Sequence, residues 1–221
     1  MSAEQKTEIS AAMRELLPEP TIQRLPWYFA YVSRLRSLGV ERVSSTQISR
    51  QLNVDASQIA KDLSFLNVRG KTRIGYDVEQ LEAALADFLG FQLQHKAVIF
   101  GVGSLGAALM SDTGLGRYGL DIVAGFETDS RKIGGNVYHI DDMAEIIRRI
   151  GAEIGIIAVP HDVAQEVADR AVDAGIKALW NFTPHRLQKR PGVVMQDTSI
   201  YSHLALMYNR LEQQRLREAC E

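Results

Sequence analysis

The hydrophobic pattern of the chain changes near residue 95. Before that point apolar residues recur at helical spacing, as in 24–39, where Leu25, Tyr28, Val32 and Leu35 share one face. Beyond it, short runs of Val, Ile and Ala alternate with amphipathic helical stretches. The pattern predicts an α/β fold in two parts: an all-helical or winged-helix N-terminal domain and a C-terminal α/β domain.

Six strands are expected in the second part, separated by helical patterns. Near-continuous apolar strands that alternate with helices indicate a parallel sheet covered on both faces, so we expect a Rossmann doubly wound sheet. The expected strands are 97–102, 120–127, 136–140, 154–160, 178–182 and 193–197, and the helices among them include 104–112, 141–151 and 161–175.

The composition suggests four segments. Residues 1–23 are polar and acidic and are expected to form a frayed helix or arm. Residues 24–92 form the first domain, in which Pro26 is placed in the first turn of a helix and Gly39 ends it. Residues 93–198 form the Rossmann domain. Residues 199–221 form a long helix that packs on its own domain or on a partner subunit.

Two short helices within the first domain follow each other closely. Ser44 or Ser45 is the expected N-cap of the first and Asp55 of the second, with only Asn53 and Val54 between them. This spacing predicts a helix-turn-helix, and the basic segment 67–78 that follows predicts a β-hairpin wing.

Charge is distributed unevenly, although the whole chain carries only −2. Residues 24–76 hold nine basic and three acidic side chains, whereas 77–221 hold 14 basic and 20 acidic ones. Such asymmetry predicts that the first domain binds a polyanion, here double-stranded DNA. The alternative is a helical cap or dimerisation bundle with a solvated basic face.

In a helix-turn-helix, the start of the second helix faces base edges while neighbouring groups hold phosphates. The residues expected near base edges are Ser57, Gln58 and Lys61, and those expected near the phosphate backbone are Ser44, Ser45, Thr46 and Arg50. In the wing, Arg69, Lys71 and Arg73 would reach phosphates or a minor groove.

The remaining composition narrows the class of protein. The single cysteine, Cys220, excludes an internal disulfide and a cysteine metal cluster, and it fits a reducing cytoplasm. The histidines show no metal-ligand spacing. We therefore expect a cytoplasmic protein without a metal site, a secretory signal or a membrane span.

The stretch "AVIFGVGSLGAAL" carries Gly101, Gly103 and Gly106 in the spacing of a dinucleotide-binding turn. Gly101 allows the tight turn, Gly103 lets the backbone approach a pyrophosphate, and Gly106 allows close contact of helix and strand. Glu127 ends the next strand, where an acid binds ribose hydroxyls and repels a 2′-phosphate. The pattern predicts NAD(H) rather than NADP(H), although the cations Arg131 and Lys132 lie nearby.

The ends of two later strands face the same edge of the sheet, so Val159, Pro160, Asn181 and Phe182 are candidates for the nicotinamide half. They are equally compatible with ordinary strand-to-helix turns. No catalytic residue is expected. A small NAD-dependent dehydrogenase or reductase would need His161 or His185 as its acid–base group, and a regulator governed by another nucleotide is a further alternative.

Eight collinear segments together resemble the Rex redox-sensing transcriptional repressors of bacteria. These segments are "TIQRLPWY", "RVSSTQIS", "KDLSFL", "IGYDV", "FGVGSLGAAL", "VAGFETDSRKIG", "IIAVPHDVAQEVAD" and "AGIKALWNFTPHRL". The resemblance implies a homodimer that exchanges its C-terminal helix, represses by binding operator DNA, and is released by NADH while NAD+ permits binding. The nucleotide contacts it implies are Gly101, Val102, Gly103, Ser104, Leu105, Gly106, Glu127, Lys132, Val159, Pro160, Asn181 and Phe182.

The chain departs from the family pattern at three positions. Ala60 stands where the recognition helix usually has an arginine, and Ala30 and Asp112 replace an arginine and a tyrosine. In the family those two residues couple nucleotide state to domain orientation through an aspartate that matches Asp197. The resemblance therefore implies Asp197 as the switch residue, with the rest of the coupling rebuilt or weakened.

Overall fold

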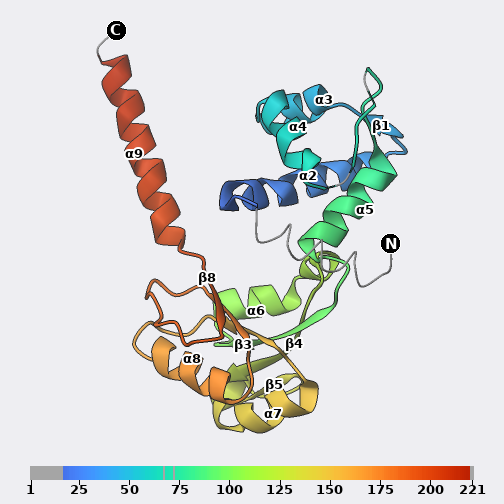
Figure 1. Cartoon of the computed structure of the whole chain (residues 1–221). Helices are drawn as coiled ribbons and strands as arrows, with labels where there is room; N and C mark the ends of the chain where they lie inside the picture. Colours follow the sequence, from blue (N-terminus) through green and yellow to red (C-terminus); the bar gives the residue numbers. More distant parts are fainter. Residues whose placement is uncertain (1–16, 67, 72, 220–221) are drawn as a thin grey trace. The chain divides into compact units, whose positions relative to one another are not determined.

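The computed structural model describes residues 17–66, 68–71 and 73–219. The chain divides into two compact units between Leu93 and Gln94, and each unit is described by itself. The predicted fold class is confirmed: a helical N-terminal unit precedes a parallel α/β unit (Figure 1). No helix among the described residues is long and apolar enough to span a membrane.

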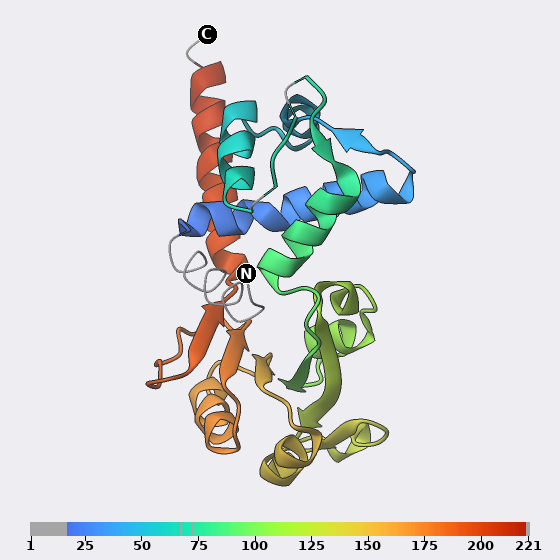
Figure 2. The same cartoon turned by 45° about the vertical axis from the view of Figure 1, so that its right-hand side comes forward.

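The N-terminal unit is built on α2 (Glu19–Ser37), against which α5 (Val78–Leu89) packs (Figures 1 and 2). The two short helices α3 (Ser45–Leu52) and α4 (Ala56–Ser64) pack on each other. One apolar cluster unites the four helices, and its fully buried members include Leu25, Tyr28, Ile48, Leu63 and Leu85.

The start of α2 differs from the sequence expectation. The helix begins at Glu19, within the expected arm, because Pro18 is its N-cap and Pro20 lies in its first turn, where a missing N–H costs nothing. Pro26 therefore lies inside the helix rather than in its first turn, and it leaves the Ile22 carbonyl without its usual partner. Residues 1–16 of the expected arm lie outside the described residues.

The expected wing is shorter than a regular hairpin. Strand β2 (Tyr76–Asp77) pairs antiparallel with β1 (Arg42–Val43), and a single bridge joins Lys71 to Gly75. Gly75 has φ +88°, and a Cβ there would lie 2.4 Å from the Val43 carbonyl oxygen. The segment after α4 thus returns to the strand that precedes α3 through a contact that only glycine permits.

The C-terminal unit has a six-stranded, entirely parallel sheet in the order β5-β4-β3-β6-β7-β8. This is the 3-2-1-4-5-6 order of a dinucleotide-binding fold, whose switch point lies between β3 and β6. The strands are β3 (His95–Phe100), β4 (Leu120–Glu127), β5 (Val137–His139), β6 (Ile154–Ile157), β7 (Ala178–Asn181) and β8 (Val194–Asp197).

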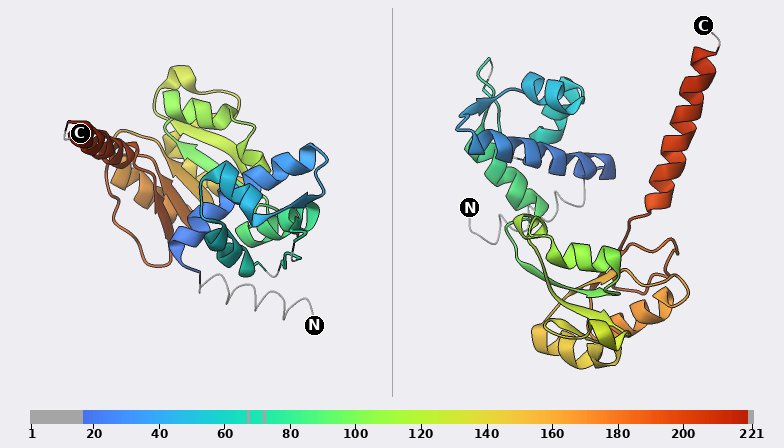
Figure 3. Two further views of the ribbon diagram at one scale, coloured as in Figure 1. Left: turned by 90° about the horizontal axis from the view of Figure 1, so that it is seen from above. Right: turned by 180° about the vertical axis from the view of Figure 1, so that it is seen from behind.

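Helices cover both faces of this sheet (Figure 3). On one face α7 (Met143–Ile150) and α8 (Ala164–Asp173) bury Val98, Phe100 and Phe126. On the other face α6 (Ser104–Ser111) packs over Ala97 and Ile99. The alternation along β3 follows the two-residue period of a strand.

The half of the second face that belongs to β6 and β7 is less covered. Trp180 and Phe182 there are only partly buried, and their rings lie 4.6 Å apart. The Trp180 indole N–H donates to Thr198 Oγ1 at 2.9 Å.

In the N-terminal unit, Trp27 on α2 is 59% exposed.

The final helix, α9 (Ile200–Glu218), has no buried residue. Its exposed apolar side chains are Ile200, Tyr201, Leu206, Met207, Tyr208, Leu211 and Leu216. A helix with this many exposed apolar residues carries a surface that water does not favour.

Candidate nucleotide site and nucleic-acid interface

The glycine turn joins β3 to α6 at the switch point of the sheet. Gly101 has φ +92°, and a Cβ on it would lie 2.5 Å from the Ala158 carbonyl oxygen. A Cβ on Gly106 would lie 2.0 Å from the Gly101 carbonyl oxygen. Gly103, in contrast, has nothing within 4 Å of its Cβ position, so the space beside it is open to a ligand.

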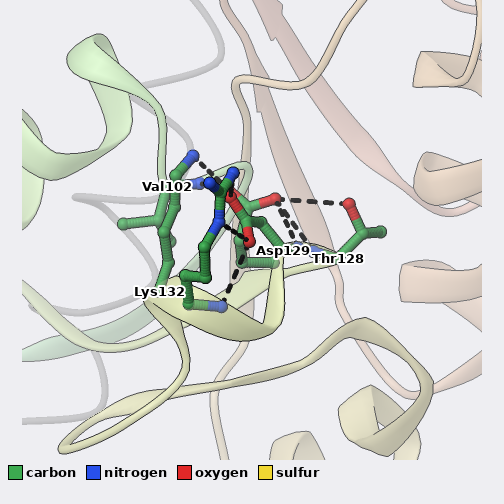
Figure 4. A network of polar contacts seen from close by, with 6 residues as sticks. Val102, Thr128, Asp129 and Lys132 are labelled. Atoms are coloured by element: carbon green, nitrogen blue, oxygen red, sulfur yellow. Dashed lines mark hydrogen bonds and ion pairs between the residues drawn. The ribbon is translucent and has the colours of Figure 1, made fainter.

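Glu127 ends β4 beside this turn. Figure 4 labels three of its hydrogen-bond partners, Val102, Thr128 and Lys132, and draws the contacts as dashed lines. Its Oε2 accepts from the Val102 backbone N–H at 3.1 Å and from Lys132 Nζ at 3.1 Å. Its Oε1 accepts from the Thr128 backbone N–H at 2.8 Å. Burial raises the pKa of Glu127, but the backbone donors and Lys132 outweigh it, so the pKa lies below the ordinary value and the side chain is a carboxylate at neutral pH.

The two cations near this carboxylate are both paired. Lys132 binds Glu127, and Arg131 forms a two-pronged contact with Asp129, from Nε at 3.0 Å and from Nη2 at 2.8 Å. Each of these two positive charges thus has its own carboxylate, which weakens its attraction for a phosphate.

A pocket of about 640 Å³ opens at the carboxyl ends of β3, β4 and β6. Six of the predicted nucleotide residues line it: Gly101, Gly103, Glu127, Lys132, Val159 and Pro160. Its size suits a cofactor site, and its position is where open parallel sheets bind their ligands.

The pocket also has walls that the sequence analysis missed. They include the apolar side chains of Ile140, Val163 and Val167 and the guanidinium of Arg170. Val163, Val167 and Arg170 recur every three to four residues around the start of α8, directly after β6. That periodicity, read together with the strand end before it, was the available signal.

Asn181 does not line this pocket. Its Nδ2 donates to Asp197 Oδ1 and to the His185 carbonyl oxygen, both at 2.8 Å, and its Oδ1 accepts twice from Thr183. The side chain of Asn181 is therefore occupied in holding the loop after β7 to the end of β8. Val102, Ser104, Leu105, Gly106 and Phe182 also lie outside the pocket lining.

Asp197 and His185 border a second, polar hollow of about 400 Å³, together with Arg186 and His203. His161 is exposed in the loop after β6. Among the described residues, no group of three or more His, Cys, Asp and Glu side chains could hold a metal ion.

The helix-turn-helix has well-defined ends. Ser44, rather than Ser45, caps α3 in a reciprocal pair with Gln47, with Gln47 N donating to Ser44 Oγ at 3.1 Å. Asp55 caps α4 by accepting from the Ser57 backbone N–H at 2.7 Å. Asn53, in the left-handed region at φ 53°, makes the turn between them.

The side chains predicted to contact DNA differ in exposure. Gln58, Ser44 and Ser45 are half-buried. The exposed ones are Thr46, Arg50, Ser57, Lys61, Arg69, Lys71 and Arg73. None of these exposed cations forms an ion pair with a described residue, so their charges are available to a polyanion.

Two protein families match this chain, one in each of its two structural units. Residues 17–64 match a family described as "Putative DNA-binding protein N-terminus", and residues 93–185 match one described as "CoA binding domain".

The matches to curated relatives cover most of the chain. The chain is 51% identical over 200 residues to the redox-sensing transcriptional repressor Rex of Bacteroides thetaiotaomicron, a match that covers 88% of this chain and 91% of that protein. It is 38% identical over 182 residues to redox-sensing transcriptional repressor Rex 1 of Thermotoga maritima, covering 80% and 88%.

Solved structures with a similar fold point to the same family as the curated relatives. The chain is 32% identical to RSP in complex with β-NAD+ and operator DNA, with a TM-score of 0.84 over 92% of this chain and 96% of that one. For RSP in complex with β-NADH the values are 33%, 0.82, 93% and 99%. RSP is described as a Rex-family repressor.

Proposed function

Since this chain belongs to the Rex family of redox-sensing transcriptional repressors, we propose that it binds operator DNA through its N-terminal unit and leaves it when NADH binds. The chain is a DNA-binding repressor regulated by NAD(H), and its family is one of regulators rather than enzymes. The structural observation that carries the proposal is the Glu127 carboxylate at the glycine turn, in a chain that begins with a basic helix-turn-helix.

The turn and the pocket support the proposed nucleotide position. The open space at Gly103 and the N-terminus of α6 suit the pyrophosphate, and Glu127 suits the adenosine ribose. Lys132 stays paired with Glu127 beside that ribose, and Ile140 and Val163 offer apolar walls for the adenine. Val159 and Pro160 face the nicotinamide half.

The loop after β7 links the nicotinamide half to the switch residue. Phe182 follows Asn181, whose side chain holds Asp197. We assign to Asn181 the role of transmitting loop movement to Asp197. The family's other two coupling residues are absent: Ala30 has no polar group, and Asp112 accepts a hydrogen bond from the Gly114 backbone N–H at 2.6 Å.

We assign the DNA interface to the helix-turn-helix and wing. Lys61, Ser57 and half-buried Gln58 on α4 face base edges, and the residues near phosphates are Ser44, Ser45, Thr46, Arg50, Arg69, Lys71 and Arg73. Lys61→Ala is expected to weaken operator binding, and binding by both proteins is expected to depend steeply on the salt concentration. Binding by Lys61→Ala that equals wild type at every salt concentration contradicts this placement.

A homodimer is the proposed assembly, with α9 exchanged between subunits. The apolar residues exposed along α9 and the thin cover over Trp180 and Phe182 support a second copy as the occupant. Residues 24–92, 93–198 and 199–221 then act as DNA-binding, nucleotide-binding and exchange segments. A repressor works where the chromosome lies, so we propose the cytoplasm.

The decisive experiment titrates the protein–operator complex with each nucleotide. NADH is expected to release a palindromic operator in a mobility-shift assay, while NAD+ leaves it bound, because only a ligand with unequal affinity for two states shifts their populations. NADPH and coenzyme A serve as control nucleotides. Equal responses to NADH and NAD+ contradict redox sensing, and a response to coenzyme A alone favours regulation by another nucleotide.

A further inference from the structure

A buried carboxylate ties the recognition helix to α2. Asp62, on α4, is fully buried. It accepts from Arg24 Nε at 2.7 Å and Nη2 at 2.8 Å, from Tyr28 OH at 2.8 Å and from Thr21 Oγ1 at 3.1 Å. The fifth donor is Gln58 Nε2, at 2.8 Å, one helical turn earlier on α4 itself.

Asp62 can only accept hydrogen bonds here. The Arg24 fork matches a carboxylate, and two further hydroxyl donors leave no room for a proton on either oxygen. Burial raises the pKa of Asp62, but the donors from Arg24, Tyr28 and Gln58 outweigh it, and the pKa lies below the ordinary value. An acceptor-only partner fixes which end of the Gln58 amide faces it: the nitrogen.

The other end of the amide is therefore directed away from Asp62. Among residues 17–66, 68–71 and 73–219, none donates a hydrogen bond to the side-chain oxygen of this amide, Gln58 Oε1. Gln58 is half-buried, and among the described residues only Ser33 Oγ is a buried side-chain polar atom without a partner, so the unpartnered Gln58 Oε1 reaches solvent. It is the third residue of α4, in the first turn, where a helix-turn-helix reads bases, and exposed Lys61 follows one turn later.

We propose that Gln58 reads an amino-bearing base, adenine or cytosine, in the major groove of each half-site. Asp62 is the positioning residue: by binding Gln58 Nε2 it turns the side-chain oxygen, Gln58 Oε1, toward that base. The exocyclic amino groups of adenine and cytosine are the donors on major-groove edges, whereas guanine and thymine present acceptors there. The free N–H of the same amide can pair with adenine N7, which favours adenine of the two. The inference rests on the assignment of α4 as the recognition helix.

The test begins with selection from a randomised DNA duplex library by the full-length protein and by Gln58→Ala. Gln58→Ala is expected to lose the sequence preference at one base pair of each half-site and to keep it elsewhere. Gln51→Ala, which removes an exposed glutamine of α3, is the matched control and keeps every preference. If the wild type selects no sequence at all, DNA recognition by this chain fails and not only the role of Gln58.

A functional-group substitution then identifies the contact. At the base pair found, 2-aminopurine replaces adenine, or 2-pyrimidinone replaces cytosine, which removes the amino group from the major groove. Wild type is expected to lose about fivefold or more in affinity and Gln58→Ala to lose nothing further, since one good base contact has that magnitude. An equal loss in both proteins, or a preference unchanged in Gln58→Ala, overturns the proposal.

The positioning role of Asp62 has its own readout. Asp62→Asn can present either end of its amide to Gln58, so the preference at that same base pair is expected to relax while the other positions stay selective. Should Asp62→Asn not fold, Gln58→Met keeps the length of the side chain, removes the amide and leaves the buried carboxylate in place, and it is expected to lose the same preference at that base pair. Uniform weakening across all sequences in either variant would mean a purely structural role.

Discussion

Two glycines of the nucleotide turn, Gly103 and Gly106, are needed for different reasons. Gly106 is required by the chain itself, because a Cβ would meet the Gly101 carbonyl oxygen. Gly103 meets nothing in the chain, so its lack of a side chain serves only what binds beside it. Stability and nucleotide affinity can therefore be separated at these two positions.

Gly106→Ala is expected to lower both thermal stability, by about 1–3 kcal/mol, and NADH affinity, because the turn must open to accept the methyl group. Gly103→Ala is the matched control: its melting temperature stays at the wild-type value, while NADH affinity falls by about tenfold. Calorimetric titration and thermal unfolding measure the two quantities. A Gly103→Ala protein that binds NADH normally would place the pyrophosphate elsewhere.

We expect Glu127 to determine the choice between NADH and NADPH in the same local way. Glu127→Gln removes the negative charge that opposes a 2′-phosphate and frees Lys132, so the preference for NADH over NADPH is expected to fall by about tenfold or more. Glu153→Gln is the control, because that carboxylate is also paired with a lysine, Lys177, but precedes β6 at the opposite edge of the sheet. Unchanged discrimination in Glu127→Gln contradicts the assignment.

At the scale of helices and strands, the predicted bounds agree best with the structure where the hydrophobic residues follow a single period. The strand expected at 120–127 is β4 with the same bounds, and Gly39 ends α2 in the left-handed region as expected. The predicted start of α2 was wrong because Pro20 and Pro26 were both compatible with the first turn of a helix. The Asp62 network joins residues up to 41 positions apart, and no periodicity records such contacts.

The bond of Asn181 to Asp197 was missed for a related reason. Parallel pairing of β7 with β8 brings the two side chains together, and this register is set by the whole sheet rather than by local sequence. The pattern identified the strand ends correctly, yet it could not distinguish a side chain that faces a ligand from one that holds a loop.

The attachment of α4 to α2 is expected to depend on pH. Because the folded pKa of Asp62 is depressed, the stability it contributes is present above the unfolded pKa and is lost as pH falls through the folded one. Wild type should therefore lose unfolding free energy below about pH 4. Asp62→Asn should be less stable by about 3–5 kcal/mol at neutral pH and show a shallower acid dependence.

Denaturant titrations at several pH values measure this difference. Glu41→Gln, at an exposed acid of the same unit, is expected to change neither the stability nor its acid dependence appreciably. An Asp62→Asn protein with the wild-type pH profile would show that another carboxyl governs the acid transition.

At the scale of the whole molecule, we expect α9 to govern assembly. Leu211 is 45% exposed on α9 and belongs to the apolar surface that the proposed partner covers. Leu211→Asp is expected to convert the dimer to monomers in sedimentation velocity and to abolish operator binding, because a palindrome requires two copies. Glu212→Gln, next to it, is expected to stay dimeric. A dimeric Leu211→Asp protein places the subunit contact on other residues.

The two tryptophans of the chain lie one in each unit: Trp27 is exposed on α2, and Trp180 is half-buried with its indole bonded to Thr198. Each unit therefore carries its own fluorophore. Replacing either tryptophan by phenylalanine leaves emission from one unit alone. Reduced nicotinamide absorbs light in the range where tryptophan emits, so bound NADH can quench that emission by energy transfer. Two variants that each keep one tryptophan can therefore report changes in the two units separately.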